Sequence, residues 1–200
     1  MIYLDHAATA PLCPAAKEAM LEAMEAVGNP SSLHSAGVNT KKILEASRKS
    51  LADSLGCEPE ELLFTSGGTE ANALALCGRE KVLTSPMEHP SVLNNCKDPL
   101  LLPVQGTGVA DIGGLEPLLA RGVDLVSLQV VNSETGLFQP AEELGHLCRS
   151  YRIPFHSDGV QAAGKVELSL RDLPFDLFSF ASHKFGGPVG IGGLYRKALL

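Results

Sequence analysis

Short hydrophobic runs recur along the whole chain, and glycine, proline or small polar residues bound most of them. Each run is only a few residues long, which favours buried β-strands, because a helix of similar hydrophobicity needs about 10–12 residues. The strands predicted in this way cover residues 62–65, 81–84, 100–104, 125–130, 153–156, 177–180 and 192–195.

Segments with helical periodicity lie between several of these runs. Residues 15–26 are rich in alanine, glutamate, methionine and leucine, and residues 38–55 repeat apolar side chains at helical spacing before Gly56. Shorter helices are expected to begin near Thr69, Pro90, Gly114 and Pro140. This alternation predicts an α/β fold, with a mostly parallel mixed sheet covered by helices on both faces. No internal repeat or low-complexity linker interrupts it, so one domain is sufficient.

Composition and charge narrow the class of protein. The chain has 200 residues, of which 44% are hydrophobic and 20% charged, and its net charge is −7 without a basic block. This argues against nucleic acid or a membrane surface as a partner. No apolar run approaches the roughly 20 residues of a membrane span, and the first residues do not form a secretory signal. A cytoplasmic location is therefore expected.

The five cysteines are odd in number, scattered, and never spaced as C-x-x-C. A disulfide framework or a structural zinc site is not indicated, and free thiols in a reducing compartment are expected. The histidines likewise show no metal-binding spacing such as H-E-x-x-H, so no metal site is predicted.

A lysine and an aspartate follow two of the predicted strands. Lys184 comes after the run at 177–180 and directly before the sequence Phe-Gly-Gly-Pro, an unusual place for a solvated lysine. Burial there would lower the pKa of the amine and free it to form an imine. Asp158 follows the run at 153–156, although it could also be an ordinary helix N-cap. Pyridoxal phosphate (PLP) requires such a pair: an amine for its aldehyde and a carboxylate for its pyridine nitrogen.

A glycine-containing turn after the first predicted strand is a candidate phosphate site. Residues 65–72 leave this strand and open a helix, so that free N–H groups of the first turn can point at an anion. Gly68 would allow close approach, and the hydroxyl of Thr69 would add a donor. An ordinary strand-to-helix turn is an equally good interpretation of this segment alone.

Other polar residues at strand ends have both a functional and a structural interpretation. His89 precedes Pro90 at an expected helix start, where it could stack on a flat ring and exchange protons or could simply be a surface cap. Asn132 could donate to a cofactor oxygen or cap a turn. Gln161 lies three residues after Asp158, so a helical turn would aim both side chains at one ligand. His156 is predicted to be structural.

Taken together, these segments resemble the class V aminotransferase family, and specifically the cysteine desulfurases of the NifS/IscS kind. Single motifs are weak signals, but their number and order make the resemblance specific, and it runs the length of the chain. The motifs that carry it lie at residues 3–11, 28–34, 64–70, 88–89, 131–136, 156–161 and 182–188.

The resemblance implies PLP as cofactor, the large domain of PLP-dependent fold type I, and a role for each matching residue. Lys184 resembles the lysine that binds the cofactor, Asp158 the partner of the pyridine nitrogen, and His89 the residue that stacks on the ring and moves protons. The remaining matches are Gln161 and Asn132, on the phenolate side or the substrate, and Gly68, Thr69 and His183, on the phosphate. The family usually has serine where this chain has Ala181, and Ser182 is the candidate to replace its phosphate contact.

The resemblance also implies a domain organisation. Residues 1–14 would form an N-terminal strap and residues 15–200 the PLP-binding large domain, with the C-terminal small domain missing from this chain. In the family that small domain carries the cysteine that accepts sulfur and an arginine for the substrate carboxylate. None of the five cysteines here occupies the nucleophile position, and those outside the strap are expected to be small buried hydrophobic residues.

The implied reaction converts L-cysteine to L-alanine and transfers sulfur to an enzyme cysteine. Iron-sulfur cluster assembly, a sulfur-acceptor protein and a homodimer are the associated expectations. Three other interpretations stay open: a related PLP enzyme such as a selenocysteine lyase or an aminotransferase, a non-catalytic truncated scaffold, and a nucleotide-binding α/β domain. The last lacks both the G-x-G-x-x-G and Walker patterns.

Overall fold

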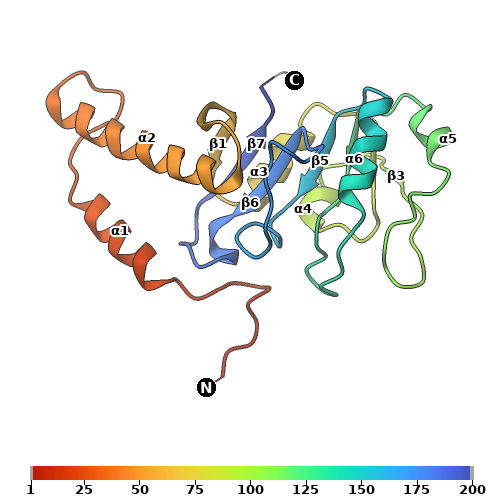
Figure 1. Ribbon diagram of the computed structural model, residues 1–200, viewed down its shortest axis with the longest axis horizontal. Helices are drawn as coiled ribbons and strands as arrows, with labels where there is room; N and C mark the ends of the chain where they lie inside the picture. The colour runs from red at the N-terminus through yellow and green to blue at the C-terminus, as the bar shows by residue number, and fades with distance from the viewer. Residues whose placement is uncertain (1, 199–200) are drawn as a thin grey trace.

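The computed structural model describes residues 2–198, which contain a seven-stranded sheet. Its strands lie in the order β1-β7-β6-β5-β4-β2-β3 (Figure 1). Their bounds are β1 Leu62–Thr65, β2 Val82–Thr84, β3 Leu100–Leu101, β4 Leu125–Ser127, β5 Phe155–Asp158, β6 Leu177–Ala181 and β7 Gly192–Arg196. All seven predicted strands are present.

The predicted strands differ from the observed ones mainly at their ends. The run at 100–104 gives only the two-residue β3, because Pro103 has no N–H group to continue the ladder. The run at 153–156 is shifted to Phe155–Asp158, since Pro154 stands before it. Regular pairing of β4 ends at Ser127, although the Leu128 N–H still donates to the His156 carbonyl at 3.1 Å.

The sheet is mixed and mostly parallel, as predicted. Neighbours β3, β2, β4, β5 and β6 pair in parallel, whereas β7 is antiparallel to both β6 and β1. With β7 the reversed strand, β1 runs in the same direction as the other five. The carboxyl ends of β1, β2, β4, β5 and β6 therefore meet at one edge of the sheet, where ligands bind in open α/β folds.

Within residues 2–198, six α-helices connect or flank the strands. They are α1 Pro14–Met24, α2 Ser35–Leu55, α3 Gly68–Leu76, α4 Pro90–Leu93, α5 Glu116–Leu119 and α6 Ala141–Ser150, with short 3₁₀ turns at Pro59–Glu61 and Ser182–Lys184. The helix at 38–55 was predicted to stop at Gly56, and this glycine ends α2 in the left-handed conformation at φ 67°. The segment after Asp158 forms turns, in which the Ala163 N–H donates to the Gly159 carbonyl at 2.8 Å.

Two apolar clusters cover the two faces of the sheet. Alternate residues of one strand serve different clusters: Leu125 of β4 packs with α3, whereas Val126 packs in the larger cluster with α6. Phe155 and Phe178 are fully buried in that larger cluster. This alternation explains why β4 reads as continuously hydrophobic in the sequence.

Helices α1 and α2 lie at one end of the molecule and bury little surface in the described chain (Figure 1). Among residues 2–198, α1 has no buried residue, and α2 has only Gly37, Ala52 and Leu55. An apolar groove of about 590 Å³ runs between these helices, with Ile43, Leu44 and Phe64 in its lining. No helix in the described part of the chain is long and apolar enough to cross a membrane.

Candidate active site

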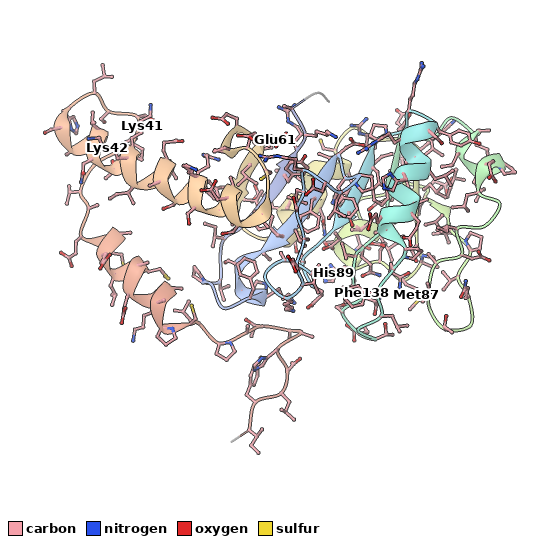
Figure 2. The ribbon with its side chains drawn as sticks, viewed as in Figure 1. Lys41, Lys42, Glu61, Met87, His89 and Phe138 are labelled. Atoms are coloured by element: carbon pink, nitrogen blue, oxygen red, sulfur yellow. The ribbon has the colours of Figure 1, made fainter. Side chains whose placement is uncertain are left out.

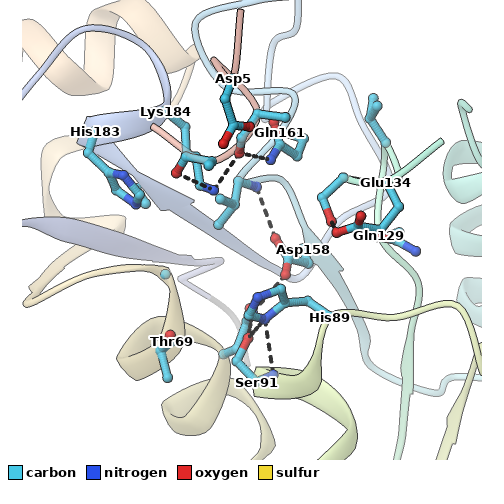
Figure 3. A pocket seen from close by; sticks show the side chains of 18 residues that line it. Asp5, Thr69, His89, Ser91, Gln129, Glu134, Asp158, Gln161, His183 and Lys184 are labelled. Atoms are coloured by element: carbon cyan, nitrogen blue, oxygen red, sulfur yellow. Dashed lines mark hydrogen bonds between the residues drawn. The ribbon is translucent and has the colours of Figure 1, made fainter. Parts of the chain in front are cut away.

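A cavity of about 530 Å³ opens at the carboxyl edge of the sheet (Figure 3). Residues following five different strands contribute to it, together with part of the N-terminal segment. The lining comprises Asp5, Ala7, Ala8, Gly68, Thr69, Asn72, His89, Ser91, Gln129, Val131, Ser133, Glu134, Asp158, Val160, Gln161, Ala181, His183 and Lys184. Seven of the nine predicted site residues are in this set, and Asn132 and Ser182 are not.

Lys184 ends the 3₁₀ turn after β6 and reaches into the cavity beneath the N-terminal segment. Its Nζ donates to the backbone carbonyls of Ala7, at 2.6 Å, and Ala8, at 3.0 Å (Figure 3). Partial burial lowers the pKa of the amine, while the carboxylates of Asp158 and Asp5 act in the opposite direction. The amine therefore loses its proton more readily than a lysine on the surface, as a nucleophile must.

Asp158 is the last residue of β5, and its carboxylate lies in the floor of the cavity. The side chain is 6% exposed. Its Oδ1 accepts from the Val160 N–H at 2.9 Å, and its Oδ2 accepts from Asn72 Nδ2 at 2.7 Å. Burial raises the pKa of Asp158, but these two donors and the nearby His89 and Lys184 favour the ionised form.

The backbone at Gly159 makes room for Asp158 at this position. A Cβ atom on Gly159 would lie 1.8 Å from Cζ of Phe178, whose ring is fully buried in the core. The close approach of the chain to this ring requires glycine. Core packing thus fixes the point at which the chain leaves β5 after the aspartate.

His89 is the N-cap of α4, so the predicted cap is present, and the same side chain lines the cavity. Its Nδ1 accepts from the Ser91 backbone N–H at 3.0 Å and lies 2.6 Å from Ser91 Oγ. These contacts leave Nε2 as the ring nitrogen available to a ligand. The capping role and a functional role are compatible here.

The first turn of α3 forms the end of the cavity predicted to bind phosphate. Gly67 is the N-cap and has no side chain, so the first N–H groups of α3 are not capped by it. A Cβ atom on Gly68 would lie 2.6 Å from Cγ2 of Val160, which shows how closely the two chain segments approach. Thr69 is exposed to the cavity, and His183 lies across from it (Figure 3).

Three predicted residues have other contacts in the structure. Asn132 caps its own turn, since Oδ1 accepts from the N–H groups of Glu134 and Thr135 and Nδ2 donates to Met87. The Ser182 hydroxyl contacts the carbonyls of Pro188 and Ile191. Gln161 lines the cavity, and its Nε2 donates to the Ala7 carbonyl at 2.8 Å. Cofactor contacts of Asn132 and Ser182 stay predictions.

Two further buried titratable residues lie close to the cavity. His156 is enclosed between Ser127 and Ser179, at 2.8 and 3.0 Å, and burial lowers its pKa to about 3, so it is a neutral structural histidine. Glu88 accepts from the Gln129 N–H through Oε1, at 2.8 Å, but its buried Oε2 has no partner in the described chain. Burial raises the pKa of Glu88 well above the usual value, and Asp158 adds to this effect.

Several lining residues had no assigned role in the sequence. Asn72 and Ser91 contact Asp158 and His89, and Gln129 and Glu134 border the opposite wall. For Asn72 the sequence offers a partial signal. It lies four residues after Gly68, which is about one turn further along the same face of the helix. The carbonyls of Ala7 and Ala8 carry no side-chain signal at all.

The residues present fit PLP on structural grounds. One cavity combines an amine with a lowered pKa, a buried carboxylate and an uncapped helix N-terminus beside a glycine that allows close approach. These groups match the aldehyde, the pyridine nitrogen and the phosphate of the cofactor, respectively.

The fold and the site define an α/β protein of the kind that binds PLP at the carboxyl edge of its sheet. The family model described as aminotransferase class V matches residues 2–200. The chain therefore belongs to the aminotransferase class V family.

Individual relatives agree with this family. The chain is 39% identical to the mitochondrial cysteine desulfurase of Drosophila melanogaster, over 98% of this chain and 46% of the relative. It is 37% identical to the cysteine desulfurase IscS of Dictyoglomus turgidum, over 98% of this chain and 54% of the relative. The chain thus spans about half the length of these curated relatives.

Solved structures show the same architecture. A NifS-like protein superposes with a TM-score of 0.93 at 31% identity, covering 99% of this chain and 59% of the solved one. A structure described as SspA in complex with cysteine also gives a TM-score of 0.93 at 31% identity, covering 99% of this chain and 62% of that one.

Proposed function

We propose that this chain is the cofactor-binding part of a PLP-dependent cysteine desulfurase, which converts L-cysteine to L-alanine and passes the sulfur to an enzyme cysteine. The observation that carries this proposal is the placement of Lys184 and Asp158 in one cavity beside the N-terminus of α3. Similarity to cysteine desulfurases and to a structure described with bound cysteine supports the substrate.

The residues divide the work according to their chemistry. PLP, when bound, supplies a reactive aldehyde and an electron-withdrawing ring. Lys184 offers an amine that burial helps to deprotonate, and the negative charge of Asp158 favours a proton on the pyridine nitrogen. Gly68, Thr69 and His183 bind the phosphate, and the free Nε2 of His89 gives or takes a proton on the substrate side.

The sulfur-accepting cysteine is expected outside these residues. The five cysteines of the chain are all unpaired, and none of them borders the cavity within residues 2–198. Unpaired thiols support a reducing compartment, and we propose the cytoplasm. A homodimer, and a sulfur-acceptor protein in iron-sulfur cluster assembly, complete the proposal.

Titration with PLP tests the central claim. The purified chain is expected to develop the visible absorbance band of lysine-bound cofactor, whereas Lys184→Ala is expected to lose it. Borohydride reduction and peptide mapping of the wild type should then find the added mass at Lys184. Absence of the band, or a band of equal strength in Lys184→Ala, would remove PLP chemistry from this site.

A further inference from the structure

Two polar residues without an assigned role connect His89 with Asp158 through an unbroken chain of hydrogen bonds. Asn72 Nδ2 lies 2.7 Å from Asp158 Oδ2 and 2.9 Å from Ser91 Oγ. Ser91 Oγ in turn lies 2.6 Å from His89 Nδ1. Asn72, Ser91 and Asp158 are 1%, 7% and 6% exposed, so this part of the chain of hydrogen bonds is buried, whereas its His89 end is exposed to the cavity.

The direction of each hydrogen bond follows from the ends of the chain. An ionised carboxylate can only accept, so the nitrogen end of the Asn72 amide must face Asp158. The same nitrogen donates to Ser91 Oγ, which leaves the single hydroxyl proton of Ser91 free for His89 Nδ1. Since Nδ1 also accepts from the Ser91 backbone N–H, it carries no proton itself, and the proton of the neutral ring is on Nε2.

The orientation of the Asn72 amide leaves one of its own atoms without a hydrogen bond. This unfavourable feature supports a specific role for the amide nitrogen. Its Oδ1 is buried without a hydrogen-bond partner in the described chain. An unsatisfied buried acceptor is unfavourable, and it persists only where the other contacts of the group outweigh it. The reversed amide would require a protonated Asp158 and would draw the Ser91 hydroxyl toward Asn72 Oδ1 and away from His89.

We propose that Asn72 and Ser91 are positioning residues that couple the ionisation of Asp158 to the tautomer of His89. With Asp158 ionised, the chain of donors holds His89 in the form that presents Nε2–H to the cavity. The protonation state of Asp158 then determines which nitrogen of His89 carries the proton. This role in catalysis rests on the proposed function, whereas the network itself belongs to the cofactor-free protein.

Nitrogen-15 NMR of the neutral His89 ring in the cofactor-free protein tests the proposal. The wild type is expected to show a protonated Nε2 and an Nδ1 signal displaced by hydrogen bonding. Ser91→Ala should shift Nδ1 toward the value of a free acceptor nitrogen. It should also make one Asn72 side-chain amide proton exchange about fivefold faster, because that proton loses its acceptor.

Matched variants separate the network from general effects of substitution. Ser91→Thr keeps the hydroxyl and should restore the wild-type signals. Ser133→Ala makes the same chemical change in the lining of the same cavity but outside the network, and should leave the His89 ring signals unchanged. Asp158→Asn removes the carboxylate and should allow the Asn72 amide to reverse, with a change at Nδ1 similar to that in Ser91→Ala.

Two results would overturn the proposal: a proton on Nδ1 in the wild type, or Nδ1 signals that are identical in the wild type and Ser91→Ala. Addition of PLP to the same samples gives an independent readout. A missing absorbance band would count against the proposed function and leave the network intact. The NMR signals of the cofactor-free protein bear only on the network.

Discussion

Two buried carboxyl groups near the cavity differ in the number of their hydrogen-bond donors. Asp158 accepts from Val160 and Asn72, one donor to each oxygen, whereas Glu88 accepts only from Gln129. Burial raises the pKa of both groups, and that of Glu88 is raised well above its usual range. The carboxyl group with more hydrogen-bond donors ionises first, so Glu88 is the acid that retains a proton while Asp158 is negative.

Substitution of Glu88 by glutamine tests this assignment through the pH dependence of stability. In the unfolded chain the carboxyl titrates at its ordinary pKa of 4.5, whereas the folded chain keeps the proton to higher pH. Unfolding above pH 4.5 therefore releases a proton, and rising pH destabilises the wild type through this group. Because glutamine does not titrate, the stability of Glu88→Gln relative to the wild type should increase as the pH rises from 5 to 8.

Urea unfolding of both proteins at several pH values measures this difference directly. The other titrating groups are shared by the two proteins, so their contributions cancel in the comparison. A difference in unfolding free energy that is constant across the pH range would show that Glu88 is not held neutral by the fold.

The sequence could predict those site residues whose position at the end of a strand was enough to place them in the cavity. Asp158 ends one buried strand and Lys184 follows another, and parallel strands bring their carboxyl ends together. Asn72 and Ser91 depend instead on contacts across 86 and 19 positions of the chain, which no local pattern encodes. Asn132 was left with two interpretations, and the turn cap is the one seen in its contacts.

At the scale of elements, the first turn of α3 determines how an anion can approach the sheet. Its position was predictable because a strand, a glycine pair and a helical pattern follow one another in the sequence. The contact of the N-terminal segment with Lys184 was not predictable: the carbonyls of Ala7 and Ala8 accept from the amine, and a backbone contact has no sequence signature. After Asp158, turns at residues 159–166 satisfy the backbone locally.

Substitution of Gly68 by alanine tests the role of this turn. The new Cβ would lie 2.6 Å from Cγ2 of Val160, so the Val160 side chain, the helix end or the segment after Asp158 must move. We expect PLP affinity to fall about tenfold, equivalent to about 1.4 kcal/mol, as measured by absorbance titration.

Two further variants make the Gly68 test specific. The double variant Gly68→Ala, Val160→Ala removes the clashing methyl group and should recover most of the affinity. Gly67→Ala adds the same atom one residue earlier, where nothing lies within 4 Å, and should bind PLP like the wild type. Equal losses in Gly67→Ala and Gly68→Ala, or no recovery in the double variant, would contradict a role of close approach.

At the scale of the whole molecule, α1 and α2 expose apolar side chains that no other part of the described chain covers. Leu21, Met24, Val38, Ile43 and Leu44 are all exposed large hydrophobic residues on these helices. The sheet half of the molecule, by contrast, contains two continuous clusters of buried apolar residues. The sequence predicted both helices but not that they would extend from the body, because helical periodicity does not identify the surface against which a helix packs (Figure 2).

The expected homodimer provides a test of this surface. If two copies associate through α1 and α2, the purified chain should show a concentration-dependent rise toward twice the monomer mass in light scattering. Leu44→Glu places a charge in the apolar groove and should raise the dissociation constant at least about tenfold. Leu101→Glu makes the same change at an exposed position on β3, at the opposite end of the molecule, and should associate like the wild type (Figure 1). A wild type that stays monomeric throughout, or equal losses in the two variants, would exclude this face as the dimer contact.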